Sequence, residues 1–141
     1  MTMEYTANQL DEVEDLFLLI ADIIEKFPDI KGVSSGAIMS TYQKTRVVNI
    51  CDRLGLTSLA YLWERDQKLL LQEMIDRGMH VILIKVASYG LHKVHLGQTL
   101  AQMKDYLFEL SDNYGVHPCG EGGEFESLTL DCPIYKQRIQ M

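Results

Sequence analysis

The fold class is decided by Val81-Ile82-Leu83-Ile84-Lys85-Val86-Ala87, a short run in which only Lys85 is not apolar. A continuous apolar run rich in β-branched residues is typical of a strand buried on both faces. Such strands belong to parallel sheets that helices cover on each side. The sequence therefore predicts an α/β fold with three layers and a parallel sheet.

Helical patterns lie on both sides of this run. Apolar residues recur at helical spacing, and capping residues mark where helices begin and end. The predicted helices cover residues 10–27, 40–54, 66–78 and 97–113, with Ser40 and Asp66 as N-caps and Pro28, Gly55 and Gly78 as stop signals. Further strands are expected at residues 32–38 and 127–130. Strands that alternate with helices favour one α/β domain over residues 1–141.

The composition excludes several classes of protein. A chain of 141 residues, 47% apolar and 23% charged, can bury a single core. Its net charge of -7 disfavours nonspecific nucleic-acid binding. No apolar run approaches the roughly 20 residues that span a bilayer, and we expect no membrane association. Three cysteines without a CxxC pair argue against a disulfide framework and indicate a cytoplasmic protein.

A glycine-rich loop precedes the last predicted strand, with the sequence GVHPCGEGGEFE over residues 115–126. Glycine lets a backbone approach a ligand closely and adopt positive φ. Its three glutamates, Glu121, Glu124 and Glu126, would repel a phosphate unless a cation lay between them. We therefore expect the loop to bind a cation, either a metal or an amine.

The second predicted helix has a polar face. Tyr42, Arg46, Asn49 and Arg53 follow one another at helical spacing, so they lie close to one side. This face could hold an anion, and the small residues that lead to Ser40 would help, because a helix N-terminus attracts negative charge. The alternative is an ordinary solvated surface.

Histidine and cysteine leave two alternatives open. His92, His95, His117 and Cys119 are of the types that bind zinc, although nothing in the sequence brings the two pairs together, and turn or packing roles are the alternative. Cys119 could have a lowered thiol pKa and act as a nucleophile, or it could be a structural thiol.

Several motifs in order resemble the diphthine–ammonia ligase family, ATP-binding enzymes of the adenine nucleotide alpha hydrolase type. They are GVSSGAI (32–38), STYQKTRV (40–47), CDRLGL (51–56), LW (62–63), the glycine-rich loop (115–126) and LDCP (130–133). The resemblance extends from about Asp11 to the C-terminus. It implies a Rossmann-like three-layer domain of the adenine nucleotide alpha hydrolase kind.

The resemblance also implies a reaction, the ATP-dependent amidation of diphthine on translation elongation factor 2. ATP and Mg²⁺ would convert the diphthine carboxylate into an acyl adenylate, and ammonia would displace AMP. A carboxylate needs such activation because its oxygen is a poor leaving group. Diphthine carries a trimethylammonium group, so an acidic loop beside Phe125 would also offer this cation a favourable field.

Site residues follow from the same resemblance. Glu121, Glu124 and Glu126 are expected to be catalytic and to serve the quaternary ammonium, the incoming ammonia or a magnesium ion on ATP. Residues expected to form the nucleotide pocket are Gly36, Ala37, Ser40, Tyr42, Gln43 and Arg46. Those expected to contact the substrate are Cys119, Gly120, Gly122, Gly123 and Phe125. No dedicated metal site is expected.

Family members open with a strand and an SGGKDS-like loop that grips the ATP phosphates, and this sequence has neither. We therefore expect the C-terminal two-thirds of a ligase catalytic domain, without its first strands and catalytically incomplete alone. An exposed sheet edge recruits partners, so a homo-oligomer is expected. The alternatives are a noncatalytic binding module and a metal-dependent hydrolase that uses the glutamates.

Overall fold

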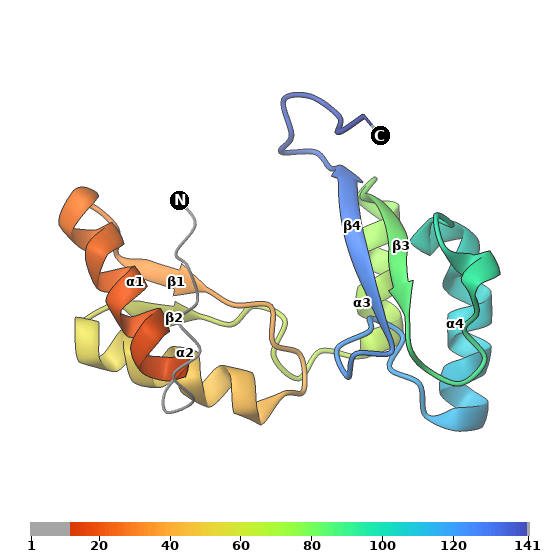
Figure 1. Ribbon diagram of the computed structural model, residues 1–141, viewed down its shortest axis with the longest axis horizontal. Coiled ribbons are helices and arrows are strands. Elements are labelled where there is room, and N and C mark those ends of the chain that lie inside the picture. The colour runs from red at the N-terminus through yellow and green to blue at the C-terminus, as the bar shows by residue number, and fades with distance from the viewer. Residues whose placement is uncertain (1–11, 141) are drawn as a thin grey trace. The chain divides into compact units, whose positions relative to one another are not determined.

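The structure is a computed structural model that describes residues 12–140, so the predicted helical position Leu10 and the family-matched Asp11 lie outside it. Its elements divide between two compact units (Figure 1). The N-terminal unit, described over residues 12–63, contains α1 (Glu12–Lys26), β1 (Gly32–Ser34), α2 (Thr41–Leu54) and β2 (Thr57–Leu59). The C-terminal unit, residues 64–140, contains α3 (Gln67–Asp76), β3 (His80–Val86), the 3₁₀-helix η1 (Lys93–His95), α4 (Leu100–Tyr114) and β4 (Phe125–Asp131).

The N-terminal unit is built around a β-α-β arrangement. Strands β1 and β2 are parallel, and α2 connects them while packing against both strands and against α1. Gly32 lies opposite Thr57, where an added Cβ would lie 2.7 Å from the Thr57 carbonyl oxygen. Only glycine allows this close approach. The predicted parallel pairing is therefore confirmed in this unit, in a small sheet of two strands.

Capping residues define α2 as the sequence predicts. The Ser40 side chain accepts a hydrogen bond from the Gln43 amide, and Gly55 ends the helix at φ 67° while donating to the Cys51 carbonyl. The left-handed conformation of Gly55 costs little because glycine has no Cβ. Ile50 and Cys51 form the buried face of α2.

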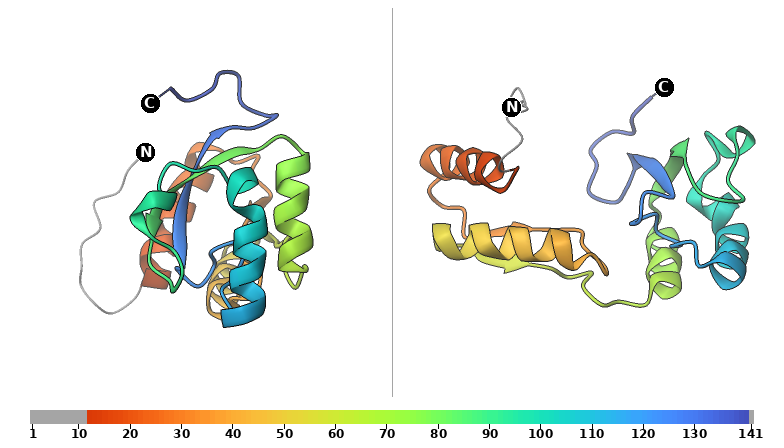
Figure 2. Two further views of the ribbon diagram at one scale, coloured as in Figure 1. Left: turned by 90° about the vertical axis from the view of Figure 1, so that its right-hand side faces the viewer. Right: turned by 60° about the horizontal axis from the view of Figure 1, so that its bottom comes forward.

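The C-terminal unit packs its helices on an antiparallel strand pair. Helices α3 and α4 lie side by side, and α4 contacts β3 (Figure 2). Asp66 caps α3 by accepting from the Leu69 amide, as predicted. Thr99 and Gln102 form a capping box, and α4 begins at Leu100, three residues after the predicted start at Gly97.

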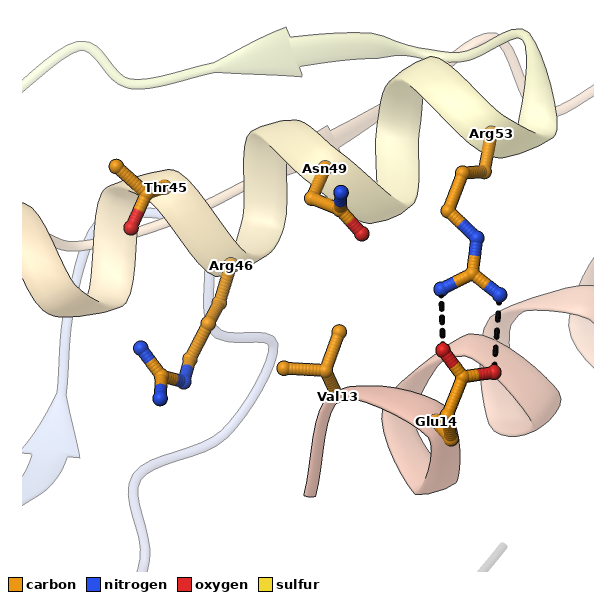
Figure 3. A pocket seen from close by; sticks show the side chains of 6 residues that line it. All are labelled: Val13, Glu14, Thr45, Arg46, Asn49 and Arg53. Atoms are coloured by element: carbon orange, nitrogen blue, oxygen red, sulfur yellow. Dashed lines mark hydrogen bonds and ion pairs between the residues drawn. The ribbon is translucent and has the colours of Figure 1, made fainter. Parts of the chain in front are cut away.

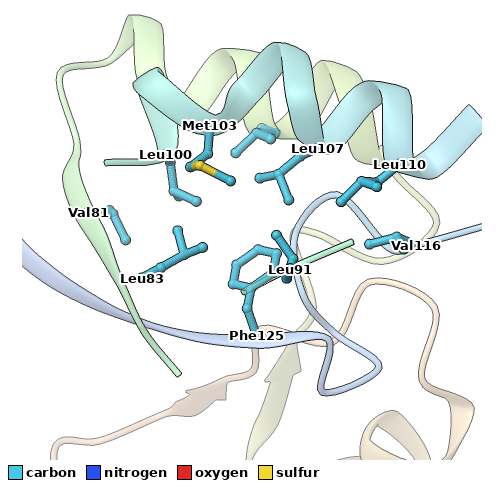
Figure 4. Packing of buried hydrophobic residues seen from close by; sticks show 10 residues of the cluster. Val81, Leu83, Leu91, Leu100, Met103, Leu107, Leu110, Val116 and Phe125 are labelled. Atoms are coloured by element: carbon cyan, nitrogen blue, oxygen red, sulfur yellow. The ribbon is translucent and has the colours of Figure 1, made fainter. Parts of the chain in front are cut away.

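One apolar cluster forms the core of the C-terminal unit (Figure 4). Side chains of α4 meet side chains of β3 and β4 there, and Leu83 and Leu107 are fully buried. The buried members are Leu71, Val81, Leu83, Leu91, Leu100, Met103, Leu107, Leu110, Val116 and Phe125. This cluster fixes β4, and with it the end of the glycine-rich loop.

The prediction that the Val81 run forms part of a parallel sheet is wrong. Strand β3 pairs antiparallel with β4, and its last residues include exposed Ile84 and Lys85. An apolar run predicts burial but carries no information on strand direction. A helix between two strands favours a parallel crossover, yet here the chain re-enters at the end where β3 finished, because Phe125 at the start of β4 lies opposite Val86 at the end of β3. The fold class is nonetheless a mixed α/β fold.

The sequence predicts a single domain over residues 1–141. The structure divides the chain into two compact units, and that they form one domain stays a prediction. Within residues 12–140, no helix is both long enough and apolar enough to span a bilayer.

Candidate functional site

Two places in the structure hold polar groups that the protein itself leaves unsatisfied. Across the described residues, the buried side-chain atoms without a hydrogen-bond partner are Ser35 Oγ, Ser88 Oγ, His117 Nε2 and Glu124 Oε2. Each such atom costs about 1–3 kcal/mol. His117 and Glu124 belong to the glycine-rich loop, and Ser88 donates its amide to the Glu124 carbonyl. Ser35 adjoins the predicted nucleotide turn, so both predicted sites contain such atoms.

Glycines shape the loop around its acidic and aromatic residues. Gly120 and Gly123 have φ of 73° and 83°, a conformation that favours glycine. An added Cβ at Gly120 would lie 2.9 Å from the Phe125 ring, and one at Gly122 would lie 2.7 Å from Glu124 Oε1. The loop can therefore fold Phe125 and Glu124 back onto its own backbone.

Glu124 is fixed at both its main chain and its side chain. Its carbonyl oxygen accepts from the amides of Ala87, at 2.8 Å, and Ser88, at 3.1 Å, just after β3. Its Oε1 accepts from the His117 amide at 3.0 Å. The second carboxylate oxygen, Oε2, is buried and accepts from no group of the protein. Glu124 is therefore fixed in place while one of its two carboxylate oxygens lacks a hydrogen-bond donor.

The His117 ring is held between the backbone and Glu121. The Cys119 amide donates to His117 Nδ1 at 3.2 Å, so the neutral ring carries its proton on Nε2. Nε2 faces Glu121 Oε2 at 3.5 Å, too far for a hydrogen bond, although a protonated ring would form an ion pair. The two side chains are only 12% and 11% exposed. Two of the predicted glutamates, Glu121 and Glu124, therefore approach the same histidine.

Glu126 is not brought to His117. Its carboxylate is exposed and pairs with Lys85 of β3 at 2.6 Å. Phe125, between the two glutamates, points into the core cluster and is buried (Figure 4). Strand alternation separates Phe125 from Glu126, because successive side chains point to opposite faces.

Cys119 is a neutral thiol. Burial, with a smaller contribution from the negative charges of Glu121 and Asp66, raises the pKa of its thiol to about 11 from the ordinary 9.0. Its Sγ donates to the Gln67 carbonyl oxygen at 3.3 Å. The alternative of a lowered thiol pKa is therefore wrong, and a thiolate nucleophile is disfavoured at neutral pH.

The zinc alternative finds no support in the described residues, where no three His, Cys, Asp or Glu side chains are grouped to hold a metal. His92 and His95 instead meet each other, because the His92 amide donates to His95 Nδ1 at 3.0 Å. The expectation that the chain has no dedicated metal site stays a prediction. Magnesium usually binds through one or two carboxylates together with substrate phosphates.

The second candidate site is the turn that leads from β1 into α2. Ala37 is buried, whereas Gly36 is exposed and has open space where a Cβ would stand. The Ser40 side chain accepts from the Gln43 amide, and the Gln43 side chain is exposed. Gly36 thus has open space beside it, and the buried Ser35 hydroxyl next to it lacks a hydrogen-bond partner.

The cations on α2 meet carboxylates of α1. Glu12 accepts from the Tyr42 hydroxyl and from Arg46 Nε, the latter at 2.9 Å. The Tyr42 hydrogen bond, followed by Arg46, lowers the pKa of Glu12. Glu14 forms two bonds to Arg53, at 2.5 and 2.9 Å, which lower the pKa of Glu14 (Figure 3). The predicted anion-binding face thus already has anionic partners within the chain.

An open pocket lies beside these pairs, with a volume of about 470 Å³. Figure 3 shows Arg46 and Arg53 on α2, with Val13 and Glu14 of α1 opposite them. Its lining residues are Val13, Glu14, Thr45, Arg46, Asn49 and Arg53. The pocket thus contains three residues of the predicted polar face, together with the Glu14 carboxylate.

Comparison with known proteins identifies the family of the chain. Residues 66–141 match the family described as the Diphthamide synthase C-terminal domain. The chain belongs to this family. It is similar to proteins named diphthine–ammonia ligase: 58% identical to one from Danio rerio, 54% to one from Homo sapiens and 52% to one from Schizosaccharomyces pombe.

These alignments cover 96% or 97% of this chain but 53%, 51% and 23% of the relatives. The chain therefore spans about half the length, or less, of these relatives. The matched Diphthamide synthase C-terminal domain contains the whole glycine-rich loop. It does not include the turn before α2.

The sequence did not predict two features of the glycine-rich loop: the contact of Ser88 with Glu124, and the position of His117 between Glu121 and Glu124. Ser88 follows β3 and gave no signal, because a serine after a strand is common. His117 was visible in the motif, but its link to both Glu121 and Glu124 depends on the turn geometry. In the N-terminal unit, the pairing of Glu12 and Glu14 with α2 was also missed, because helix periodicity does not identify the partner helix.

Proposed function

We propose that this chain is part of a diphthine–ammonia ligase that amidates diphthine on translation elongation factor 2 to give diphthamide, with ATP and ammonia. The observation that carries the proposal is the His117–Glu124 loop, which leaves buried polar atoms unsatisfied inside the segment that matches the Diphthamide synthase C-terminal domain. The names of the relatives support the same activity.

The proposed reaction assigns the amidation step to the glycine-rich loop. Glu121 lies beside the His117 ring and Glu124 accepts from the His117 amide, and this negative charge favours a cationic or N–H-bearing reactant. Glu126 would act from the exposed face, where Lys85 holds its carboxylate. Cys119, Gly120, Gly122 and Gly123 would form the wall against which the substrate lies, with Phe125 supporting them from the core cluster.

The proposed nucleotide pocket lies at the start of α2. Gly36, Ala37 and Ser40 would bring backbone close to the nucleotide, and the helix N-terminus would favour its phosphates. Tyr42, Gln43 and Arg46 would complete the pocket. Bound ATP, accompanied by Mg²⁺, would supply the leaving group that makes the diphthine carboxylate an acyl donor. Arg46 would then have to exchange Glu12 for a phosphate oxygen.

The wider features of the proposal follow the family resemblance. The β1-α2-β2 arrangement would form part of a three-layer, Rossmann-like sheet in a cytoplasmic enzyme. Self-association is proposed as well, and light scattering at high protein concentration checks it. A monomer under those conditions would remove this part of the proposal.

Calorimetric titration of the chain with ATP and magnesium tests the nucleotide pocket. We expect saturable binding that Arg46→Gln weakens. Arg53→Gln is the matched control, because Arg53 pairs with an α1 carboxylate in the same way but lies about two turns further along α2. Equal loss in both variants would assign the effect to helix packing. No binding by the unmodified chain would remove ATP-dependent ligation by this chain alone.

An amidation assay with diphthine-bearing elongation factor 2 tests the loop. Glu124→Gln is expected to lower turnover while leaving circular dichroism unchanged, because the amide keeps the volume but loses the negative charge. Glu109→Gln, a change of the same type on the exposed side of α4, is the control. Equal activity of the Glu124 variant and the unmodified protein would overturn the role of Glu124.

A further inference from the structure

The unsatisfied atoms of the loop distinguish between the cations that it could bind. Glu124 Oε2 is a buried acceptor that lacks a donor. An ammonium ion has N–H groups that can satisfy such an acceptor, whereas a quaternary ammonium has no N–H to donate. A quaternary ammonium would leave the cost of the buried oxygen in place.

Aromatic contact, the usual means of holding a quaternary ammonium, is also weak here. Phe125, the aromatic residue of the loop, is buried in the core cluster, and the Gly120 backbone covers its ring edge. Its face is therefore not offered to a bulky cation. The loop offers oriented carboxylates instead.

We propose that His117 is a positioning residue that holds Glu121 and Glu124 as a receptor for ammonium, the source of the amide nitrogen. This inference rests on the proposed function and names the reactant that the loop receives. The His117 amide holds Glu124 Oε1, and Nε2–H of its ring faces Glu121 Oε2. One residue thus holds the Glu124 carboxylate through its main chain and lies beside the Glu121 carboxylate, and the Cys119 amide fixes its ring.

In the proposed step, Glu124 takes a proton from ammonium and the resulting ammonia displaces AMP from the acyl carbon. Ammonium loses one proton to the Glu124 carboxylate, which gives ammonia and a carboxylic acid. The lone pair of ammonia forms the new C–N bond, the bond from the acyl carbon to the adenylate oxygen breaks, and AMP leaves with that electron pair. The nitrogen loses one further proton to solvent as it becomes an amide. Glu124 then returns its proton to solvent.

Nuclear magnetic resonance titration of the chain tests the receptor without requiring ATP. The probes are ammonium chloride and tetramethylammonium chloride, each added with sodium chloride to constant ionic strength. We expect saturable shifts of the His117 and Glu124 amide signals with ammonium and none with tetramethylammonium. Equal shifts with both cations, or no shift with ammonium, would overturn the inference.

Variants separate positioning from simple charge. Glu124→Gln is expected to weaken ammonium binding about tenfold or more, because it puts a donor or a neutral acceptor where the charged acceptor stood. Glu109→Gln removes the same charge from exposed α4 and should leave affinity unchanged. A similar loss in both variants would show a general charge effect and contradict the receptor.

His117 is tested through a pair of substitutions. His117→Leu removes the ring but keeps the main-chain amide that holds Glu124. Its loss of affinity for ammonium therefore measures the contribution of the contact between the ring and Glu121. His117→Gln retains an N–H donor and is expected to recover most of that affinity. An unchanged ammonium affinity in His117→Leu, or no recovery of affinity in His117→Gln, would contradict a positioning role.

The outcomes also separate this inference from the ligase proposal. A chain that binds ATP but not ammonium would overturn the receptor and leave the proposed ligase standing. A chain that binds ammonium but not ATP would keep the receptor and remove ATP-dependent ligation by this chain alone.

Discussion

Gly122 leaves the space that the Glu124 carboxylate occupies. An added Cβ would lie 2.7 Å from Oε1 and 3.0 Å from Oε2, whereas the backbone of Gly122 is not in the left-handed region. The clash therefore involves only the flexible end of a side chain, which can move. Alanine at this position should displace the carboxylate without breaking the loop.

We predict that Gly122→Ala accelerates hydrogen exchange of the His117 amide, because that amide loses its acceptor on Glu124. The melting temperature should fall only slightly. Amide exchange measured by nuclear magnetic resonance provides the test, with Gly36→Ala as control, since nothing lies within 4 Å of a Cβ there. Unchanged exchange at His117 would show that Glu124 accommodates the methyl group in place.

The residue types of the loop could be predicted, but their arrangement could not. Glycine and glutamate in alternation indicated close backbone approach and a cation. The approach of Glu121 and Glu124 to His117, and the separate pairing of Glu126 with Lys85, depend on where the loop ends and the strand begins. Element boundaries are the least reliable part of any sequence-based prediction.

Helices α1 and α2 are joined by two charged contacts on their exposed sides. Glu12 binds Tyr42 and Arg46, and Glu14 binds Arg53. These contacts lower the pKa of both carboxyls below the ordinary 4.5. A lowered folded-state pKa contributes stability above the unfolded-state pKa, and this contribution is lost as pH falls through the folded-state value.

We therefore predict that the N-terminal unit loses stability below about pH 4.5, and that the double variant Glu12→Gln, Glu14→Gln loses less over the same range. Urea denaturation followed by circular dichroism between pH 3 and pH 7, approximately, measures the difference. Asp22→Asn is the control, because Asp22 pairs with Lys26 within α1. Parallel pH profiles for the double variant and the unmodified chain would contradict the prediction.

Capping residues explain why the helices were predictable and the strands less so. Ser40, Gly55 and Asp66 act locally, through bonds to residues three or four positions away, so the sequence shows them directly. Strand β2 was missed because its three residues give too short a pattern. The direction of β4 depends on long-range packing against α4, which no local pattern contains.

The two compact units differ in how much apolar side chain they bury. The C-terminal unit has ten buried residues in one cluster, whereas the buried apolar residues of the described N-terminal unit are Ile20, Ala37, Ile38, Ile50 and Cys51. Stability rises with the apolar surface that folding buries. The C-terminal unit should therefore be the more stable of the two.

We predict that Leu107→Ala lowers the free energy of unfolding of the C-terminal unit by about 2–5 kcal/mol, since Leu107 is fully buried. Hydrogen exchange of α2 amides should stay unchanged, and Ile50→Ala should produce the reverse pattern. Exchange measured unit by unit provides the test. Equal acceleration in both units with either variant would instead support the single cooperative domain predicted from the sequence.

The only tryptophan of the chain is Trp63, and the Lys44 ammonium lies 3.9 Å from the centre of its ring. Indole emission shifts in wavelength and intensity when a nearby charge moves. Because Lys44 belongs to the first turn of α2, the molecule carries a built-in optical reporter for that helix. Fluorescence selectively excited in Trp63 would report on the N-terminal unit alone, while the C-terminal unit, whose fluorophores are tyrosines, stays dark.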